Sequence, residues 1–395
     1  MKANQKSDNI KFTKVVYVAL LDGLDIFLNL SIITFLSIFF FSDVDSRLSI
    51  LLTSFIVLMS FLSRNEVLNI CGKIIQKFEI KRVNIFYLLA ISYVIPLFST
   101  SSLIYLSLIL FMISRFFIGN LFYLAKKSVF EDDLKSESGF FVKYTITFSI
   151  GMIVGTFFYL FFNDIFSNSQ MNDWGWKSFY LFLIFLSLIF GYFFNFYYGF
   201  NGVTSENTES SLLTKETNSL FIKNFSSIFP FYFFFIYSCS EWLPKFSNPN
   251  NMQFLDYNML YILLTVILTI FTYPLFKLIG NKRSKSFILL SITVISFAAF
   301  FFDYSSSYSI NFLKFYISLV SSFVISLNLL NNNQRVLSNS KLYLNSISLY
   351  FLVLSVITPI SFYYFINFSI SYDIVYVIIG LIFLISFLSG KYSGK

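Results

Sequence analysis

The chain has 395 residues, of which 56% are hydrophobic, 22% aromatic and only 12% charged, and its formal net charge is +8. A soluble protein of this length needs far more polar surface. The composition therefore excludes a soluble globular protein and predicts a polytopic membrane protein. Basic residues gather in alternate loops rather than in one patch, and we therefore expect no nucleic-acid partner. Histidine is absent, and two cysteines occur in opposite halves, so we expect neither a metal site nor a disulfide framework.

Twelve apolar segments are long enough to cross a bilayer as helices, which takes about 20 residues each. Most Lys and Arg residues fall in the loops on one side of these segments. The positive-inside rule places that side in the cytoplasm and predicts that both termini lie there. The predicted segments are residues 14–41, 47–69, 84–100, 103–125, 141–163, 177–199, 221–243, 256–278, 285–302, 310–330, 342–366 and 372–390.

The longest polar interval separates the sixth predicted segment from the seventh. It spans residues 201–220 and is rich in Ser, Thr, Asn and Glu, which is typical of a flexible tether. We therefore expect an all-α membrane protein with two six-helix bundles, residues 1–200 and 221–395, joined by a cytoplasmic linker. The helix count alone leaves the fold open, because flippases of lipid-linked oligosaccharides also have twelve or more helices.

The first segment carries two carboxylates inside an apolar helix. Asp22 and Asp25 follow Lys14 by eight and eleven residues, which places them roughly 12 to 16 Å deep, near the bilayer midplane. An Asp at that depth costs roughly 2.5–3.5 kcal/mol and usually faces a bundle interior. Asn29 continues the same helix face. Two interpretations remain open: the acids pair with a basic group, or they handle protons or substrate.

Arg115 lies in the middle of the fourth segment. A guanidinium in hydrocarbon needs a carboxylate, a substrate anion or water beside it. We predict that Arg115 pairs with Asp22 or Asp25. If protonation of the carboxylate opens this pair, proton binding is coupled to helix movement. The alternative is a static buried ion pair.

The loop from Phe61 to Arg82 resembles the loop 2–3 signature of major facilitator transporters, and more narrowly that of the metabolite:proton symporters. The family's acidic residue is replaced by Gln76, so the cytoplasmic latch that it forms in the family has lost its acid. Residues 273–285 resemble a weaker second copy, as expected of a duplicated transporter. The gating residues that this resemblance implies are Arg64, Gly72, Lys77, Lys81, Arg82, Asn281 and Lys282.

Other short stretches resemble the same family. Residues 173–183 and 241–246 are similar to its WGWRxPF and YLPxYL motifs, and Asp22 to Asp25 is similar to the DGxD of aromatic-acid:proton symporters. Gly151 and Gly155 are spaced for close helix packing in the fifth segment. The resemblance implies the major facilitator fold, with a central cavity. The candidate substrate-binding residues are Asn29, Asn120, Tyr123, Ser238, Ser322 and Asn328.

These features predict a secondary active transporter that takes up a small polar metabolite with protons by alternating access. An organic acid, amino acid or betaine suits the mixed charges of Asp22, Asp25 and Arg115. We expect a monomer in the lipid bilayer of the cell inner (cytoplasmic) membrane, with no cofactor. An exporter of a drug or siderophore and a lipid-linked flippase remain alternatives. No catalytic motif and no GxxxxGK[ST] sequence occurs, so we do not expect an enzyme.

Overall fold

The computed structural model describes residues 2–64, 69–77, 82–133, 140–193, 197–199 and 258–300, with single positions between 315 and 384. These residues belong to two compact units, the first holding every element up to residue 199 and the second holding residues 258–300. The predicted linker and the predicted segments at 221–243, 310–330, 342–366 and 372–390 lie wholly or largely outside the described residues.

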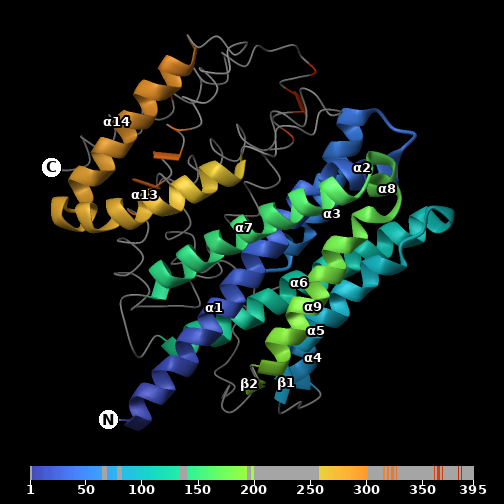
Figure 1. The fold of residues 1–395 in the computed structure, drawn as a ribbon, viewed down its shortest axis with the longest axis horizontal. Coiled ribbons are helices and arrows are strands. Elements are labelled where there is room, and N and C mark those ends of the chain that lie inside the picture. The colour runs from blue at the N-terminus through green and yellow to red at the C-terminus, as the bar shows by residue number, and fades with distance from the viewer. Residues whose placement is uncertain are drawn as a thin grey trace. The chain divides into compact units, whose positions relative to one another are not determined.

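The first unit is a helical bundle whose chain order can be followed from blue to yellow-green in Figure 1. Its elements are α1 (Lys2–Ser31), α2 (Ile33–Phe41), α3 (Ser46–Leu62), α4 (Ile70–Lys77), β1 (Arg82–Asn84), α5 (Ile85–Val94), η1 (Ile95–Phe98), η2 (Ser101–Leu103), α6 (Ile104–Asp133), α7 (Phe140–Ile165), α8 (Asn168–Gln170), η3 (Met171–Gly175), α9 (Lys177–Phe193) and β2 (Tyr197–Gly199). The second unit contains α13 (Asn258–Ile279) and α14 (Asn281–Phe300).

The first predicted segment is broken rather than continuous. Residues 14–31 and 33–41 meet at an angle of 52°, and Ile32 between them has φ −88° and ψ 2°. The Ser31 hydroxyl donates to the Phe27 carbonyl at 2.9 Å, a type of bond that often bends helices. In the described part of the chain, two helices are long and apolar enough to cross a membrane, or four if each of two bent pairs counts as one span.

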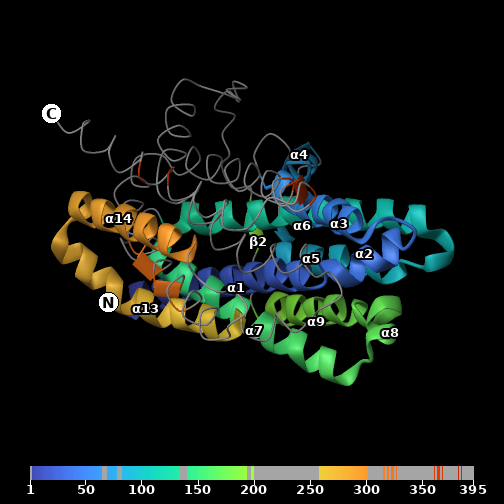
Figure 2. The same ribbon diagram turned by 90° about the horizontal axis from the view of Figure 1, so that it is seen from above.

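The helices of the first unit pack in three pairs. α1 lies along α7, α3 along α6, and α5 along α9. In the order of the six predicted segments, these pairs are first with fifth, second with fourth, and third with sixth. If the first three segments are exchanged with the last three, so that the first takes the place of the fourth, the second of the fifth and the third of the sixth, the same pairs result. Two inverted three-helix repeats have this symmetry. α1 also contacts α6 and α9, so it lies at the centre of the unit (Figures 1 and 2).

Glycines bring α1 and α7 into backbone contact. A Cβ atom on Gly23 would collide with the Phe148 carbonyl, and one on Gly151 would collide with the Leu20 carbonyl. Gly155 faces the Phe27 ring. The spacing of Gly151 and Gly155 predicted close helix packing, and in the structure both glycines lie against α1. The close approach also brings Tyr144 of α7 within reach of α1.

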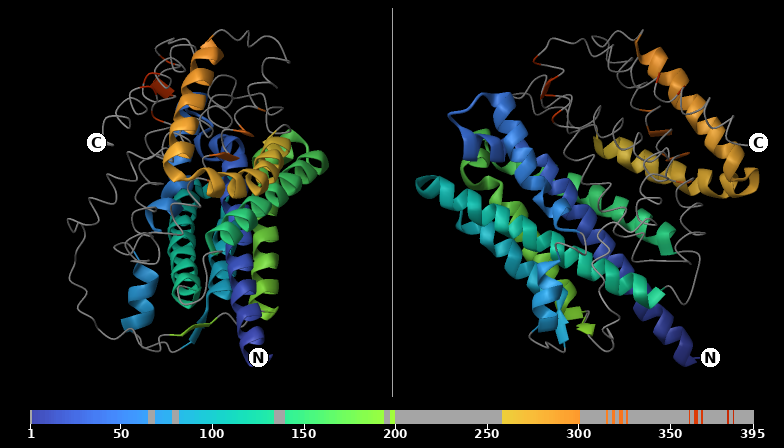
Figure 3. Two further views of the ribbon diagram at one scale, coloured as in Figure 1. Left: turned by 90° about the vertical axis from the view of Figure 1, so that its left-hand side faces the viewer. Right: turned by 180° about the vertical axis from the view of Figure 1, so that it is seen from behind.

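Two short strands replace the helix ends predicted at residues 84 and 199. β1 and β2 pair in antiparallel fashion, with Asn84 opposite Tyr197, at one end of the unit (Figures 1 and 3). Asn84 also caps α5 by accepting from the Phe86 N–H at 3.1 Å and donates to the Gly191 carbonyl at 3.0 Å. The strand pair and these hydrogen bonds therefore tie the start of α5 to the end of α9.

In the second unit, α13 and α14 are joined at Gly280. Its φ of 87° lies in the left-handed region that glycine adopts without strain, and its N–H donates to the Phe276 carbonyl at 3.1 Å. The Phe323 ring lies 5.3 Å from that of Phe276 and 5.7 Å from that of Phe287. Residues 273–285, which resemble a second copy of the loop signature, span the end of α13, the turn at Gly280 and the start of α14.

Candidate functional site

Asp25 and Arg115 form a buried bidentate ion pair between α1 and α6. Arg115 Nη1 lies 2.7 Å from Asp25 Oδ1, and Nη2 lies 3.1 Å from Oδ2. The Asp25 side chain is 0% exposed and that of Arg115 is 1% exposed. Of the two carboxylates predicted as partners of Arg115, the structure selects Asp25. A guanidinium and a carboxylate that share two such contacts fix each other's orientation and also compensate each other's charge.

Neighbouring helices complete the surroundings of this pair. The Tyr93 hydroxyl from α5 donates to Asp25 Oδ1 at 3.1 Å, and Asn29 Nδ2 donates to the same atom at 3.0 Å. The Tyr180 hydroxyl from α9 donates to Asn29 Oδ1 at 2.5 Å. On the far side, Arg115 Nη2 donates to Ser60 Oγ of α3 at 2.9 Å. The pair therefore joins α1 to α6, is contacted directly from α3 and α5, and is linked to α9 through Asn29.

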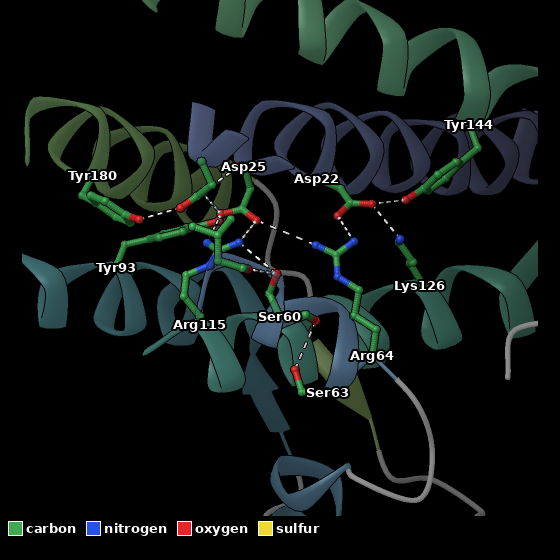
Figure 4. A network of polar contacts seen from close by, with 12 residues as sticks. Asp22, Asp25, Ser60, Ser63, Arg64, Tyr93, Arg115, Lys126, Tyr144 and Tyr180 are labelled. Atoms are coloured by element: carbon green, nitrogen blue, oxygen red, sulfur yellow. Dashed lines mark hydrogen bonds and ion pairs between the residues drawn. The ribbon is translucent and has the colours of Figure 1, made fainter. Parts of the chain in front are cut away.

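Asp22, one helical turn before Asp25, has its own set of partners. Its Oδ1 lies 2.7 Å from Arg64 Nη1, and its Oδ2 lies 2.6 Å from Lys126 Nζ. The Tyr144 hydroxyl from α7 donates to Oδ2 at 2.8 Å. Arg64 Nη2 also lies 3.7 Å from Asp25 Oδ2, so Arg64 links the two carboxylates. Figure 4 shows the resulting continuous network from Tyr180 to Lys126.

We call Asp22, Asp25, Arg64, Arg115 and Lys126 the charge cluster. Four of its side chains are at most 7% exposed, whereas Lys126 is 21% exposed. Charges this deep in a helical bundle are tolerated because each has a partner of opposite sign, and Asp22, Asp25 and Arg115 also take part in further hydrogen bonds. Within the cluster, Lys126 is the member most open to the surroundings.

Arg64 lies inside the second predicted segment and is one of the gating residues that the loop signature implies. In the structure its side chain is buried and paired with Asp22. α3 ends at Leu62, and the guanidinium turns inward over the Phe122 ring, with its carbon 5.1 Å from the ring centre. The sequence analysis named no partner for Arg64, so its pairing with Asp22 is a finding of the structure.

Lys126 and three tyrosines were missed by the sequence analysis. The predicted fourth segment ended at residue 125, whereas α6 continues to Asp133, so Lys126 is helical. It follows Arg115 by eleven residues, which is close to three turns, and this spacing places both cations on one face. Extending the helix by one turn would have revealed that pattern. Tyr93, Tyr144 and Tyr180 are among 26 tyrosines, and no sequence feature separates them from the rest.

The substrate-binding candidates on α6 are both buried. Asn120 accepts from the Cys71 N–H at 3.3 Å and donates to the Phe116 carbonyl at 3.1 Å, so its amide anchors α4 to α6. Tyr123 is 2% exposed. In the second unit, the Ser322 hydroxyl donates to the Leu319 carbonyl at 2.7 Å. Ser238 and Asn328 lie outside the described residues.

Three of the other predicted gating residues, Gly72, Lys77 and Arg82, belong to elements that the structure describes in the first unit. Gly72 is in α4, where its N–H donates to Asn69 Oδ1 at 2.9 Å, and Lys77 is the last residue of that helix. Arg82 opens β1. Lys81 lies outside the described residues, and so do the side chains of Asn281 and Lys282, which begin α14.

Cys71 offers a test of the packing of α4, the short helix beyond the second predicted span. Burial raises the pKa of its thiol from an ordinary 9.0 to about 11. Only the thiolate reacts, so we expect a Cys239→Ser variant to react with maleimide at pH 7 about 100-fold more slowly than an exposed thiol does. The rate should rise about tenfold per pH unit up to the pKa, and denaturation in SDS should remove the protection. Equal rates before and after denaturation would contradict this packing.

Comparison with known proteins identifies the fold. No protein-family model and no curated protein sequence matches the chain. Among solved structures, the major facilitator superfamily proton:xylose symporter XylE of E. coli matches with a TM-score of 0.67 and 12% identity, over 98% of this chain and 95% of its own. The E. coli fucose:proton symporter FucP matches at 0.59 and 14% identity, over 97% and 98%. The human organic anion transporter MFSD10 matches at 0.57 and 13% identity, over 96% and 98%.

The chain therefore has the major facilitator fold. The predicted all-α polytopic architecture is confirmed, and the count of twelve helices agrees with matches that span nearly the whole length of both chains. At identities of 12–14% the likeness concerns the fold and carries no substrate with it.

Proposed function

We propose that this chain is a secondary active transporter that couples the movement of a small polar metabolite to that of protons by alternating access. The observation that carries the proposal is the Asp25–Arg115 pair, buried in the helical bundle of a major facilitator fold. Intramembrane ionisable residues are rare and usually mark ion or proton pathways. XylE and FucP, which share the fold, are named as proton symporters.

The pair provides a chemical basis for coupling. When Asp25 takes up a proton it loses its charge, and the attraction that holds the Arg115 guanidinium weakens. Arg115 then needs another anion or water, which favours a rearrangement of α1 relative to α6. A substrate that binds one arrangement better than the other shifts the same equilibrium, and this shared preference couples it to the proton.

The charges of the cluster favour a substrate that carries charge. Cations and carboxylates lie within a few ångströms of each other, which suits an organic acid, an amino acid or a betaine. The substrate-binding candidates remain Asn29, Asn120, Tyr123, Ser238, Ser322 and Asn328. We propose a monomer in the cell inner membrane, and the distribution of Lys and Arg supports a cytoplasmic location for both termini.

A panel of metabolites tests this function. Purified protein is heated with each organic acid, amino acid and betaine, and a ligand present at 100 times its dissociation constant stabilises by about 2.7 kcal/mol. Each stabilising compound is then offered to proteoliposomes with and without an inward proton gradient. We expect accumulation only with the gradient. Equal uptake in both conditions would refute proton coupling, and reversing the gradient separates an importer from an exporter.

A further inference from the structure

The charge cluster carries more positive than negative charge. Its five members supply three cations and two carboxylates, so one positive charge is in excess. Asp25 and Arg115 balance each other, because the guanidinium meets both carboxylate oxygens. The excess therefore falls at Asp22, whose single negative charge is shared by Arg64 at 2.7 Å and Lys126 at 2.6 Å.

We infer that Lys126 and Tyr144 form a binding site for one carboxylate of the substrate, which takes Lys126 over from Asp22 while Asp22 keeps Arg64. The inference rests on the proposed transport function and narrows its substrates to metabolites that present a carboxylate. A neutral or purely cationic metabolite does not bind at this site.

The position of Asp22 Oδ2 shows how a carboxylate oxygen is held there. Lys126 Nζ lies 2.6 Å from this atom, and the Tyr144 hydroxyl donates to it at 2.8 Å. An ammonium group has three N–H donors, so Lys126 can bind an incoming carboxylate before it releases Asp22. Asp22 Oδ1 stays 2.7 Å from Arg64 Nη1, and the exchange therefore leaves Asp22 with a cation beside it.

These two side chains are also the ones that a ligand can reach. Lys126 is 21% exposed, whereas the other members of the charge cluster are at most 7% exposed. Tyr144 is half-buried, and the centre of its ring lies 5.6 Å from Lys126 Nζ. Both residues stand at one end of the polar network, with Tyr180 at the other (Figure 4). A ligand that approaches this end meets Lys126 and Tyr144 first.

The balance of charge decides which ligand can make the exchange. A neutral ligand would separate Lys126 from Asp22 without supplying a negative charge, and a cation would add to the positive excess. One carboxylate brings the cluster to three positive and three negative charges. Since interactions between charges are strong where water is excluded, this difference selects for an anion.

Binding of butyrate, a small carboxylate, tests the site without a transported substrate. The full-length protein in lipid nanodiscs is titrated at pH 7 and constant ionic strength, and binding is followed by saturation-transfer NMR with empty nanodiscs as the blank. Butyramide and butylammonium, which are similar in size but neutral and cationic, are the comparison ligands. We expect butyrate to bind and the other two not to bind.

Variants at Lys126 locate the bound carboxylate. Lys126→Met removes a charge-assisted hydrogen bond and should weaken butyrate binding about tenfold or more. Lys126→Arg keeps the charge and should retain binding. Lys127→Met, at the next position of α6, is the matched control and should change the affinity by less than about threefold.

Asp22→Asn should have the opposite effect. It removes the carboxylate that competes with the ligand for Lys126, so butyrate should bind about tenfold more tightly than to the wild type. Butyrate should also raise the melting temperature of this variant more than that of the wild type. Because a poorly folded protein does not bind its ligand more tightly, this readout separates competition from a general loss of structure.

The inference is overturned if butyramide binds as well as butyrate, if Lys126→Met keeps the wild-type affinity, if Asp22→Asn binds no more tightly, or if the wild type binds no butyrate. Failure of the proposed function looks different. In that case butyrate binding follows Lys126 and Asp22 as expected, while proteoliposomes accumulate none of the metabolites under a proton gradient.

Discussion

Replacing Arg115 with Met is expected to destabilise the protein by about 3–5 kcal/mol, because Asp25 would be left buried without its cation. The side chains of both residues are at most 1% exposed, so water cannot take over the role of the guanidinium. Met has a similar length and fills most of the space, which limits the packing loss. The unfolding of the purified protein in detergent, followed against denaturant concentration, measures the effect.

The double variant Arg115→Met/Asp25→Asn separates charge from packing. It removes both charges, and we expect it to recover most of the stability lost in the single variant. Arg283→Met, at an exposed position of α14, is the matched control and should change stability by less than about 0.5 kcal/mol. A double variant as unstable as the single one would mean that shape, and not the unpaired carboxylate, explains the loss.

Adding a methyl group at Gly23 or Gly151 should be almost as damaging. In either Gly→Ala variant, the new Cβ atom meets a backbone carbonyl of the facing helix and cannot be accommodated by a side-chain rotation. Overpacking of this kind costs about 1–3 kcal/mol. We therefore expect Gly23→Ala and Gly151→Ala each to lower the melting temperature and to reduce the amount of monodisperse protein on size-exclusion chromatography.

Gly155→Ala on the same helix is the internal control. Its Cβ would lie 3.1 Å from a ring carbon of Phe27, and this side chain can move by the small amount needed. We expect a smaller loss of stability than in Gly151→Ala. Equal losses in all three variants would indicate that α7 tolerates no added volume, rather than that α1 and α7 meet through their backbones.

Part of this architecture can be predicted from sequence because it depends on local composition. Apolar length sets the number of spans, and the placement of Lys and Arg sets their orientation. The Asp25–Arg115 pair is also predictable in outline, because two opposite charges in the middle of apolar helices have few other partners. The choice of Asp25 over Asp22 required the structure, since both acids lie on one face of α1.

Other features depend on contacts that no local pattern encodes. Arg64 lies inside a predicted segment but no partner was predicted for it, and Lys126 lies just past the end of one, where basic residues usually mark loops. Their pairing with Asp22 was therefore not expected. The pairing of β1 with β2 arises from contacts between residues that are distant in the chain. Such features are fixed by tertiary packing rather than by hydrophobic periodicity.

The central claim, that Asp25 couples metabolite movement to proton movement, can be tested by measuring proton flux directly. Proteoliposomes that contain a trapped pH-sensitive dye are given an inward gradient of the metabolite selected by the thermal panel, with no initial pH difference. We predict that the wild type acidifies the lumen as the metabolite enters, whereas Asp25→Asn moves the metabolite without acidification. Equal acidification by Asp25→Asn, or metabolite entry through the wild type with no change in pH, would contradict the claim.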